Sequence, residues 1–581
     1  MSGGPVKAEA QAAAVQPRRN LIDAWLYGRN IDRGAKSRAR VGLIILAFVM
    51  IYGVIAGRLV MLANEPGAHN ARRPSADAVS TARPEVLDRR GDMLAADIKA
   101  PSLFGEPRNI IDVDEAVELL TAELPDLDAA ELRDRLSSRK GFVWLKREIT
   151  PPQQDAIHRL GLPGIGFLVE NKRVYPNGPE VSHLIGHVNI DNKGIAGIEK
   201  WVDGQGLAAL HMAGLATDRQ LKPIELSLDL RVQHALRDEL IRAKEKFQAI
   251  AAAGLVTDVN TGEVVAMVSL PDYDPNDPRQ ALEANRINRL TTGVYEMGST
   301  FKALTLAMAL DSGKFSLNST VDARQPLQFG RFVIHDYHAQ NRRLTLPEVF
   351  TYSSNIGTAH LALALGVDYH RRFLKKMGQL DRLHTELPES AEPLVPQHWG
   401  EINTATIAFG HGLSVAPLQA MMGVGAVVNG GLLIPPTFLK RTPAEAAALA
   451  KRVIKPETSA EMRYLMRLNV EKGTATRANV TGYYIGGKTG TSEKVVNGRY
   501  DKHKVLNSFT AILPADKPHY LLLVMLDEPK GLPETHGFDT SGWNAVPTGA
   551  AVISRIAPLL DIAPRFDLPP PDKLILARDG G

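Results

Sequence analysis

Three short strings in the second half of the chain bring together side chains that can transfer an acyl group. Ser299 and Lys302 lie in GSTFK, Ser353 and Asn355 lie in SSN, and Lys488 begins KTGT. Average residue usage gives Ser-x-x-Lys by chance roughly once in a chain this long, and Lys-Thr-Gly on the order of a tenth of a time. The ordered set of three is therefore far more informative than any one member.

The first string supplies a nucleophile and a candidate base. Ser299 follows Gly298 at the expected start of a helix, and Lys302 lies three residues later on the same face. A serine hydroxyl is a poor nucleophile until a base removes its proton. Lysine can be that base only when burial or a nearby cation, here Lys488, keeps it neutral. We expect the backbone N–H groups of Ser299 and Thr491 to form an oxyanion hole.

The second string lies between two segments with helical patterns, 346–352 and 356–365. Such a break is suited to projecting side chains into a cleft. Ser353 would relay a proton to the leaving amine, through Lys302 or through the lysine of the third string. Asn355 would either hold the acyl-donor peptide or orient Lys302 through its amide.

The third string follows a strand-like segment, 483–487, that ends in two glycines. An extended peptide that adds to a sheet edge needs a strand with little side-chain bulk, and Gly490 meets that need. The ammonium group of Lys488 and the hydroxyls of Thr489 and Thr491 can bind a terminal carboxylate.

The composition excludes several other kinds of site. The chain of 581 residues has no cysteine, which excludes disulfides, thiolate nucleophiles and cysteine-ligated metals. Its formal net charge of +4 is too small to argue for nucleic-acid binding. We expect no cofactor.

Two groups of histidines resemble metal ligands but have simpler explanations. His183 and His187 are four apart, yet Gly186 interrupts the helix between them and no Glu follows His183. We expect structural histidines there. The second group directly precedes the second string and comprises His335, Asp336 and His338. We expect it to be a cleft-lining loop, with no metal in either group.

A membrane anchor precedes all of these motifs. Residues 41–57 are uncharged and mostly apolar, and the apolar run resumes after Arg58. As a helix, the first run reaches roughly 26 Å at ~1.5 Å per residue. Eight basic and three acidic residues lie before it, so the positive-inside rule predicts a cytoplasmic N-terminus and an extracytoplasmic bulk. The forty residues before the run argue against the alternative, a cleaved signal peptide.

Changes in composition along the chain divide it into segments. The expected segments are a basic cytoplasmic tail, a transmembrane anchor, a linker, a pedestal domain, a catalytic domain and a C-terminal tail, at 1–40, 41–63, 64–84, 85–221, 222–564 and 565–581 respectively. We expect the first segment to be disordered and the pedestal to contain at least one helix, at 111–136.

Hairpin patterns occur at both ends of the catalytic domain. Residues 254–259 and 263–270 alternate as strands around Asn-Thr-Gly, and 505–513 and 519–526 form a second pair. Helical patterns lie between them, and a closing helix is expected at 548–560. This order predicts an α+β domain built on an antiparallel sheet.

Taken together, these motifs resemble those of the class B penicillin-binding proteins. Ser-x-x-Lys, Ser-x-Asn and Lys-Thr-Gly form the known motif set of penicillin-binding proteins and serine β-lactamases. The likeness extends to the pedestal phrases RRGDMLAAD, KRVYPNG and GIEKWVD. Asn355 favours the division-specific type, often called penicillin-binding protein 3, because the elongation-specific type usually has Asp there. Met297 is a departure, since many relatives have Pro before Gly-Ser.

The resemblance implies a peptidoglycan D,D-transpeptidase whose catalytic domain has a serine β-lactamase-like fold. Ser299 would attack the D-Ala-D-Ala amide of a stem peptide, release D-Ala, and pass the acyl group to an amine of a neighbouring stem. β-Lactams would acylate the same serine. The resemblance further implies a lipid-linked precursor as substrate, a polytopic membrane glycosyltransferase and other division proteins as partners, and a place in the inner membrane at the septum.

Three alternatives share some of these features. An elongation-specific class B transpeptidase has the same architecture, and a β-lactam-hydrolysing or β-lactam-sensing protein has the same motif set. A secreted β-lactamase, however, needs neither pedestal nor anchor. The third alternative, a non-enzymatic scaffold of the cell-wall machinery, is disfavoured by the intact motif set.

Overall fold

The structure is a computed structural model that describes residues 33–64, 82–205, 221–496, 498–572 and 574. It divides into two compact units, Met1–Asp77 and Ala78–Gly581. Most of the expected cytoplasmic tail and linker, and residues 573 and 575–581 of the expected C-terminal tail, lie outside the described residues.

One long helix, α2 (Arg33–Asn64), carries the expected anchor. Its window Val41–Arg58 has a mean hydropathy of 2.2, and none of this window is buried against protein. The helix is therefore long and apolar enough to cross a membrane. The helix begins at Arg33, so residues 33–40, which were expected to be disordered, are helical. Ala, Arg and Lys in that stretch are good helix formers.

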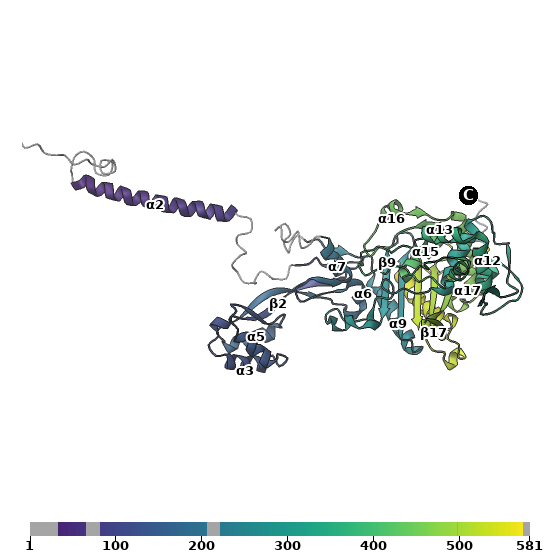
Figure 1. The fold of residues 1–581 in the computed structure, drawn as a ribbon, viewed down its shortest axis with the longest axis horizontal. Coiled ribbons are helices and arrows are strands. Elements are labelled where there is room, and N and C mark those ends of the chain that lie inside the picture. Colours follow the sequence, from purple (N-terminus) through teal and green to yellow (C-terminus); the bar gives the residue numbers. More distant parts are fainter. Residues whose placement is uncertain (1–32, 65–81, 206–220, 497, 573, 575–581) are drawn as a thin grey trace, which may run out of the picture. The chain divides into compact units, whose positions relative to one another are not determined.

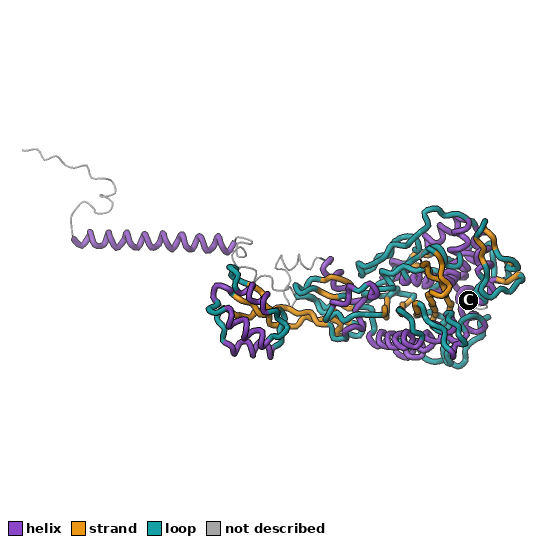
Figure 2. The backbone as a smooth tube through the Cα atoms, turned by 60° about the horizontal axis from the view of Figure 1, so that its bottom comes forward, coloured by secondary structure: helices purple, strands orange, loops and turns teal. Residues whose placement is uncertain are grey.

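The second unit begins with a sheet formed mostly by strands of the expected pedestal, joined by β7 from just beyond it. Its strands are β1 (Val86–Leu87), β2 (Met93–Gly105), β3 (Val143–Lys146), β4 (Ile165–Val174) and β7 (Ile224–Glu225). The long strands β2 and β4 are antiparallel, from Ala96 opposite Val174 to Gly105 opposite Ile165. A small helical lobe packs on their far end, as Figures 1 and 2 show, and comprises α3 (Val113–Glu123), α4 (Ala129–Leu136) and α5 (Pro151–Leu160).

The stretch at 111–136, where at least one helix was expected, forms two helices, α3 and α4. Pro125 lies between them, and proline cannot donate the backbone hydrogen bond that a helix interior requires. Asp128 then starts α4 by accepting a hydrogen bond from Glu131 N. The sequence pattern missed this break because the apolar spacing continues across it.

The catalytic domain is built on a five-stranded antiparallel sheet, which confirms the predicted α+β class. In spatial order its strands are β16 (Gly486–Val496), β17 (Arg499–Leu513), β18 (Tyr520–Asp527), β8 (Ala251–Asp258) and β9 (Val264–Leu270). Both predicted hairpins are present, as β8–β9 and β17–β18. Strand β16 lies at the edge and pairs only with β17 among the described strands.

Helices cover both faces of this sheet, so alternate strand residues enter two separate cores. On one face, Leu522 and Val524 pack with α9 (Leu230–Lys246) and α18 (Ala545–Leu559). On the other, Leu521 and Leu523 pack in the core of a group of helices, α10 (Lys302–Asp311), α15 (Pro417–Val428) and α17 (Pro456–Lys472). The closing helix expected at 548–560 corresponds to α18.

The remaining elements are short and connect these layers. The helices are α6 (Ser182–Ile185), α7 (Gly197–Gly204), α11 (Leu346–Thr351), α12 (Asn355–Leu365), α13 (Val367–Lys376), α14 (Glu401–Ile407) and α16 (Pro443–Leu449). The strands are β5 (His187–Val188), β6 (Gly194–Ala196), β10 (Thr320–Asp322), β11 (Leu327–Phe329), β12 (Phe332–Ile334), β13 (Arg343–Thr345), β14 (Leu432–Leu433) and β15 (Lys451–Arg452).

Candidate active site

The first string forms a short 3-10 turn, Gly298–Phe301, that leads into α10, as predicted for a helix start. Gly298 has a φ of +52°, and a Cβ there would lie 2.9 Å from the carbonyl oxygen of Thr491. Only glycine therefore lets this turn approach β16 so closely. Ser299 is partly exposed, and its hydroxyl makes no hydrogen bond with the described residues.

Lys302 points into the protein and not toward solvent. Its side chain is fully buried. Its Nζ donates to Asn355 Oδ1 at 2.7 Å and to Ser353 Oγ at 3.1 Å, and it also contacts the carbonyl oxygen of Ser353. Of the two roles expected for Asn355, orientation of Lys302 is thus the one that the geometry displays.

Lys488 approaches the same hydroxyl from the sheet. Its side chain is also fully buried, and its Nζ donates to Ser353 Oγ at 2.9 Å and to the carbonyl oxygen of Thr489 at 3.1 Å. The lysines of the first and third strings therefore share the serine of the second. This is the convergence that the spacing alone could not establish.

The burial of these two ammonium groups changes their protonation. Desolvation lowers the pKa of Lys302 well below its ordinary value, the charge of Lys488 lowers it further, and Asp336 opposes the change. Desolvation also lowers the pKa of Lys488 to about 7. A neutral Lys302 can accept a proton near neutral pH, which is what activation of a serine requires.

The second string is a strained turn between α11 and α12. Ser353 has a φ of +56°, a left-handed conformation that is uncommon for residues other than glycine. Ser354 stabilises the start of α12, because its Oγ accepts a hydrogen bond from Gly357 N at 2.9 Å. The expected break between two helices is therefore present, and it presents Ser353 to both lysines.

Asp336 braces this turn, a role that the sequence did not reveal. Its carboxylate accepts hydrogen bonds from Ser354 Oγ at 2.6 Å and from Ile356 N at 2.9 Å. Asn355 Nδ2 donates to the carbonyl oxygen of His335 at 3.0 Å. The segment thus lines the site, as predicted, but Asp336 does more than line it. It lies too far from Ser354 in the sequence for any local pattern to have linked them.

The third string lies inside β16, whereas the sequence predicted a strand that ends before it. The strand starts at Gly486 because the preceding residues are held elsewhere: Tyr483 N bonds to Val480 O, and Arg467 Nη1 bonds to Ile485 O at 2.9 Å. Farther along, Asn469 Nδ2 of α17 donates to Gly487 O at 2.9 Å. These bonds from α17 fix the strand that carries Lys488.

Gly490 is required by the packing behind the strand. A Cβ there would lie 2.3 Å from Ser508 Oγ and 2.7 Å from Thr300 Oγ1, both within the protein. The sequence argument attributed this glycine to a substrate contact, and the structure supplies a different reason. Thr489 is buried and shares a 2.7 Å hydrogen bond with Thr474 through its hydroxyl.

Thr491 lies next to the serine turn. It is partly exposed, and its Oγ1 accepts a hydrogen bond from Ser541 N at 3.3 Å. The close approach of Gly298 to its carbonyl brings the backbone of Thr491 alongside that of Ser299. The two backbone N–H groups assigned to the oxyanion hole therefore belong to neighbouring segments.

The two histidine groups are accounted for by packing and by the loop. His183 and His187 both contact the ring of Tyr273, with centroids 5.4 and 5.6 Å apart. Burial lowers the pKa of His183 to about 4, so that it is neutral at physiological pH. No group of three potential metal ligands occurs in the described parts of the chain.

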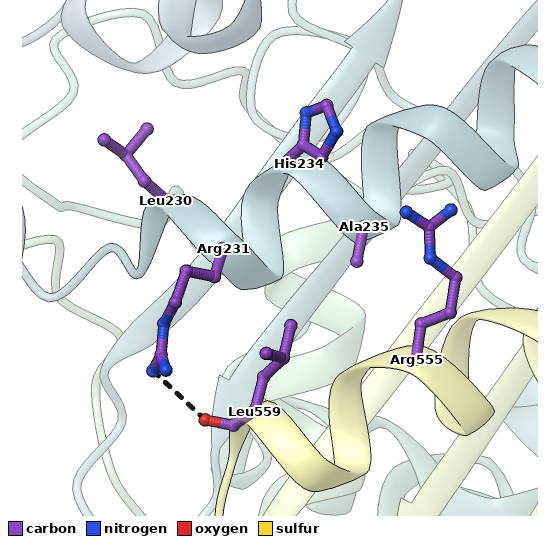
Figure 3. Close-up of a pocket in the computed structure, with 6 residues that line it drawn as sticks. All are labelled: Leu230, Arg231, His234, Ala235, Arg555 and Leu559. Carbon is purple, nitrogen blue, oxygen red and sulfur yellow. Dashed lines mark hydrogen bonds between the residues drawn. The ribbon is translucent and has the colours of Figure 1, made fainter.

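A separate surface pocket of about 540 Å³ lies between α9 and α18, and none of the motif residues lines it (Figure 3). Its two arginines are already neutralised. Arg231 pairs with Asp229 at 2.7 Å and also donates to the carbonyl oxygen of Leu559, and Arg555 pairs with Glu239 at 2.7 Å. We assign no function to this pocket.

Comparisons with known proteins agree with this geometry. A model of the penicillin-binding protein transpeptidase domain matches residues 252–542, and a model of the penicillin-binding protein dimerisation domain matches residues 78–203. The latter argues against a β-lactamase, which needs no such domain.

Two named relatives match over most of their lengths. The chain is 41% identical over 502 residues to the probable peptidoglycan D,D-transpeptidase FtsI of Caulobacter vibrioides (strain NA1000 / CB15N), covering 85% of this chain and 84% of the relative. It is 30% identical over 561 residues to the peptidoglycan D,D-transpeptidase FtsI of Escherichia coli (strain K12), covering 90% and 91%. These relatives do not favour the elongation-specific alternative.

A solved structure shares the fold. A peptidoglycan synthetase from Bifidobacterium adolescentis ATCC 15703 superimposes with a TM-score of 0.65 at 21% identity, covering 85% of this chain and 98% of that one. The family assignment and the one candidate span found in the described parts of the chain, in α2, together indicate a single-pass inner-membrane protein. The chain belongs to the penicillin-binding protein family, as a class B member of the division type: a serine D-Ala-D-Ala transpeptidase that acts on peptidoglycan and binds β-lactams.

Proposed function

We propose that the chain cross-links peptidoglycan at the division septum through an acyl-enzyme formed on Ser299. The observation that carries the proposed site is the convergence of two buried lysines, Lys302 and Lys488, on the hydroxyl of Ser353. A structural role alone would not favour two buried lysines that lack a carboxylate partner among the described residues, because burying an unpaired charge is costly.

In acylation, neutral Lys302 takes the proton of Ser299 Oγ as this oxygen attacks the carbonyl carbon of the D-Ala-D-Ala amide. The negative charge that develops on the carbonyl oxygen is stabilised by the backbone N–H groups of Ser299 and Thr491. Asn355 keeps the amine of Lys302 in place through its side-chain oxygen. The product of this half-reaction is an ester on Ser299.

Departure of D-Ala requires a proton on its nitrogen. Ser353 relays that proton, because its hydroxyl accepts hydrogen bonds from both lysines. The cationic form of Lys488, with the hydroxyls of Thr489 and Thr491, holds the terminal carboxylate. The acceptor amine of a neighbouring stem then attacks the ester, and the same groups carry the proton in the opposite direction.

The other segments place this site in the cell envelope. We assign 85–221 to the pedestal and 222–564 to the catalytic domain. The N-terminus faces the cytoplasm and the catalytic domain faces the periplasm, since the basic residues precede the apolar run that starts at Val41. The matched domains are of the transpeptidase and dimerisation types, so a separate polytopic glycosyltransferase and other division proteins supply glycan polymerisation and localisation.

Acylation by a labelled penicillin tests the site. Membranes that contain the full-length protein are exposed to the label, and the adduct is located by mass spectrometry. We expect one adduct on Ser299 that is lost in Ser299→Ala and kept in Ser554→Ala, a matched serine on α18. An adduct on another residue, or one that persists in Ser299→Ala, overturns the mechanism.

Topology and septal role need their own experiment. Because the chain has no cysteine, single cysteines at Ser2 and Ser554 report their compartments through a membrane-impermeant maleimide. We expect labelling of intact spheroplasts at position 554 only. Depletion of the protein is expected to give filaments, and rounded cells would instead indicate an elongation role.

A further inference from the structure

Glu296, three residues before Ser299, joins three segments that surround the proposed oxyanion hole. Its Oε1 accepts hydrogen bonds from Gly412 N at 2.8 Å and from Tyr500 Oη at 3.1 Å. Its own carbonyl oxygen accepts a hydrogen bond from Ser492 Oγ at 2.6 Å. One residue thus bonds to β16, to β17 and to the loop that contains Gly412.

That loop packs directly on the serine turn. Gly298 N donates to Gly410 O at 3.2 Å, and Gly410 has a φ of +90°. A Cβ at Gly410 would lie 2.0 Å from Gly298 O, so no other residue fits there without moving the turn. Any displacement of the loop is therefore transmitted to the residue that precedes Ser299.

Tyr500 lies on the part of the β16–β17 hairpin that extends beyond the main sheet. The pairing shifts after Glu493, where Lys494 lies opposite Asp501, so residues 502–504 have no partner on β16. We call the residues beyond this bulge, 494–496 and 499–501, the overhang. Tyr500 is 47% exposed, and its ring meets that of His411 edge to face at 5.5 Å.

The carboxylate itself does not reach the reacting groups. None of its hydrogen bonds with the described residues involves Ser299, Lys302 or Lys488. Its second oxygen, Oε2, is buried and has no partner among the described residues. Burial raises the pKa of Glu296 and that of Tyr500, so the tyrosine remains a neutral hydrogen-bond donor. Any effect of Glu296 on catalysis must therefore act through the segments that it joins.

We propose that Glu296 is a positioning residue for acylation, and that Tyr500 latches the overhang to it. Through Ser492, Glu296 sets the position of β16 next to Thr491, and through Gly412 it sets the turn that carries Ser299. It thereby fixes the separation of the two backbone N–H donors that stabilise the tetrahedral oxygen. This inference rests on the proposed function, because it concerns the same oxyanion hole.

The expected loss of acylation rate follows from the contribution of the two backbone N–H donors of the oxyanion hole. Loss of one oxyanion donor costs on the order of 10²-fold or more in rate, and small misplacements have comparable effects. We expect Glu296→Ala to lower the first-order acylation rate constant about 30-fold. Tyr500→Phe removes only one hydrogen bond and keeps the ring on His411, so we expect about a fivefold decrease.

The experiment measures acylation of the full-length, detergent-solubilised protein by a fluorescent penicillin. Saturation kinetics separate the dissociation constant of the initial complex from the acylation rate constant. We expect both variants to lower the rate constant and to leave the dissociation constant unchanged. Glu296→Gln keeps an oxygen at Oε1 and should recover most of the rate. Tyr369→Phe on α13, a tyrosine whose hydroxyl makes no hydrogen bond with the described residues, is the matched control and should match the wild type.

Two outcomes overturn the inference. One is a rate constant within twofold of wild type in both Tyr500→Phe and Glu296→Ala. The other is a loss that resides wholly in the dissociation constant. Thermal unfolding of Tyr500→Phe within about 2 °C of wild type excludes a general folding defect, even if Glu296→Ala folds poorly. Failure of the proposed function is distinguishable, because wild-type protein would then carry no adduct on Ser299.

Discussion

Two clusters of buried basic side chains in this protein behave in opposite ways. In the pedestal, Arg83 and Arg173 lie on either side of Glu199, with nitrogen–oxygen distances of 2.7 and 2.6 Å. In the catalytic site, Lys302 and Lys488 are equally buried, but neither forms an ion pair with a carboxylate in the part of the chain that the structure describes. Carboxylates therefore compensate the charges of the pedestal arginines, whereas the catalytic lysines have no such partner among the described residues.

The difference appears in the pKa values. Burial lowers the pKa of Arg173, but Glu199 and Asp97 more than offset this effect, and the net change is upward. Burial lowers the pKa of Lys302 and the charge of Lys488 lowers it further, and the opposing effect of Asp336 does not offset them. The same degree of burial therefore accompanies a raised pKa for the pedestal arginine and a pKa well below its ordinary value for the catalytic lysine.

The comparison separates structural from chemical uses of buried charge. The pedestal cluster joins β2, β4 and α7, because Arg173 also reaches Asp97 at 3.1 Å and Arg83 reaches Asp203 at 2.6 Å. Removing one member of such a network is strongly destabilising, because it leaves an uncompensated buried charge. An uncompensated lysine instead favours its neutral form, which is the form that a general base needs.

Removal of the uncompensated lysine should have the largest effect on activity. We expect Lys302→Met to lower the acylation rate constant about 10⁴-fold, at the upper end of general-base contributions. The free energy of unfolding should not fall, because methionine fills the volume without a buried amine. Rapid-mixing acylation and thermal unfolding of the same preparation measure both. A variant that loses stability instead of activity would contradict the comparison.

Removal of Glu199, the carboxylate that both pedestal arginines share, should lower stability and leave the acylation rate nearly unchanged. Glu199→Ala leaves two buried arginines without their central partner, so we expect the free energy of unfolding to fall by about 3–5 kcal/mol. The acylation rate constant of the folded fraction should change by less than about twofold, since Glu199 touches none of the three motifs. Chemical denaturation measures the first quantity. Glu118→Ala, an exposed glutamate on α3, is the control.

The pH dependence of acylation should report the two lysines separately. As pH falls through the lowered pKa of Lys302, the base becomes protonated and the rate falls. As pH rises through the pKa of Lys488, about 7, its cation is lost and the rate falls again. We therefore expect a bell-shaped pH profile of the second-order acylation constant. On each limb the constant should fall about tenfold from its maximum within one pH unit.

Lys488→Arg sharpens this assignment. Arginine remains charged at every accessible pH, so the alkaline limb should disappear even if the maximal rate is lower. A limb that stays near pH 7 in this variant would show that another group titrates there.

The smallest effect is expected at Asp336. Its negative charge opposes the lowering of the Lys302 pKa. Asp336→Asn removes that charge and keeps an oxygen for Ile356 N, so we expect only about a threefold loss of rate. The acid limb of the profile should move to lower pH, because Lys302 then loses its proton more readily. Movement to higher pH would contradict the electrostatic assignment.

Much of the site could be predicted from the sequence, because its chemistry requires particular residue types. Ser299, Lys302, Ser353, Asn355 and Lys488 were identified from their spacing, and the structure brings the lysines and Ser353 together. Their individual catalytic roles remain predictions. The antiparallel sheet was predicted from the strand-like segments of its two hairpins and the turn residues between them, and both faces of this sheet are buried.

What the sequence missed depends on contacts between distant residues. Asp336 and Glu296 act through hydrogen bonds to segments far along the chain, and no local pattern marks such bonds. The reason for Gly490 was also hidden, because Ser508 and Thr300 approach it only in the folded sheet. Strand β16 begins later than predicted, at Gly486, because Arg467 on α17 binds the carbonyl oxygen of Ile485, the residue before the strand.

The ionisation state of Lys302 tests the central claim most directly. Full-length protein labelled with ¹³C at the lysine ε carbons can be titrated by NMR, with Lys302 assigned by its loss in Lys302→Arg. Uncompensated burial predicts that this resonance already has its neutral position at pH 7.5 and titrates well below the ordinary lysine value of about 10.4. A resonance that titrates near that ordinary value would show that Lys302 is charged in the resting enzyme, and the account would fail.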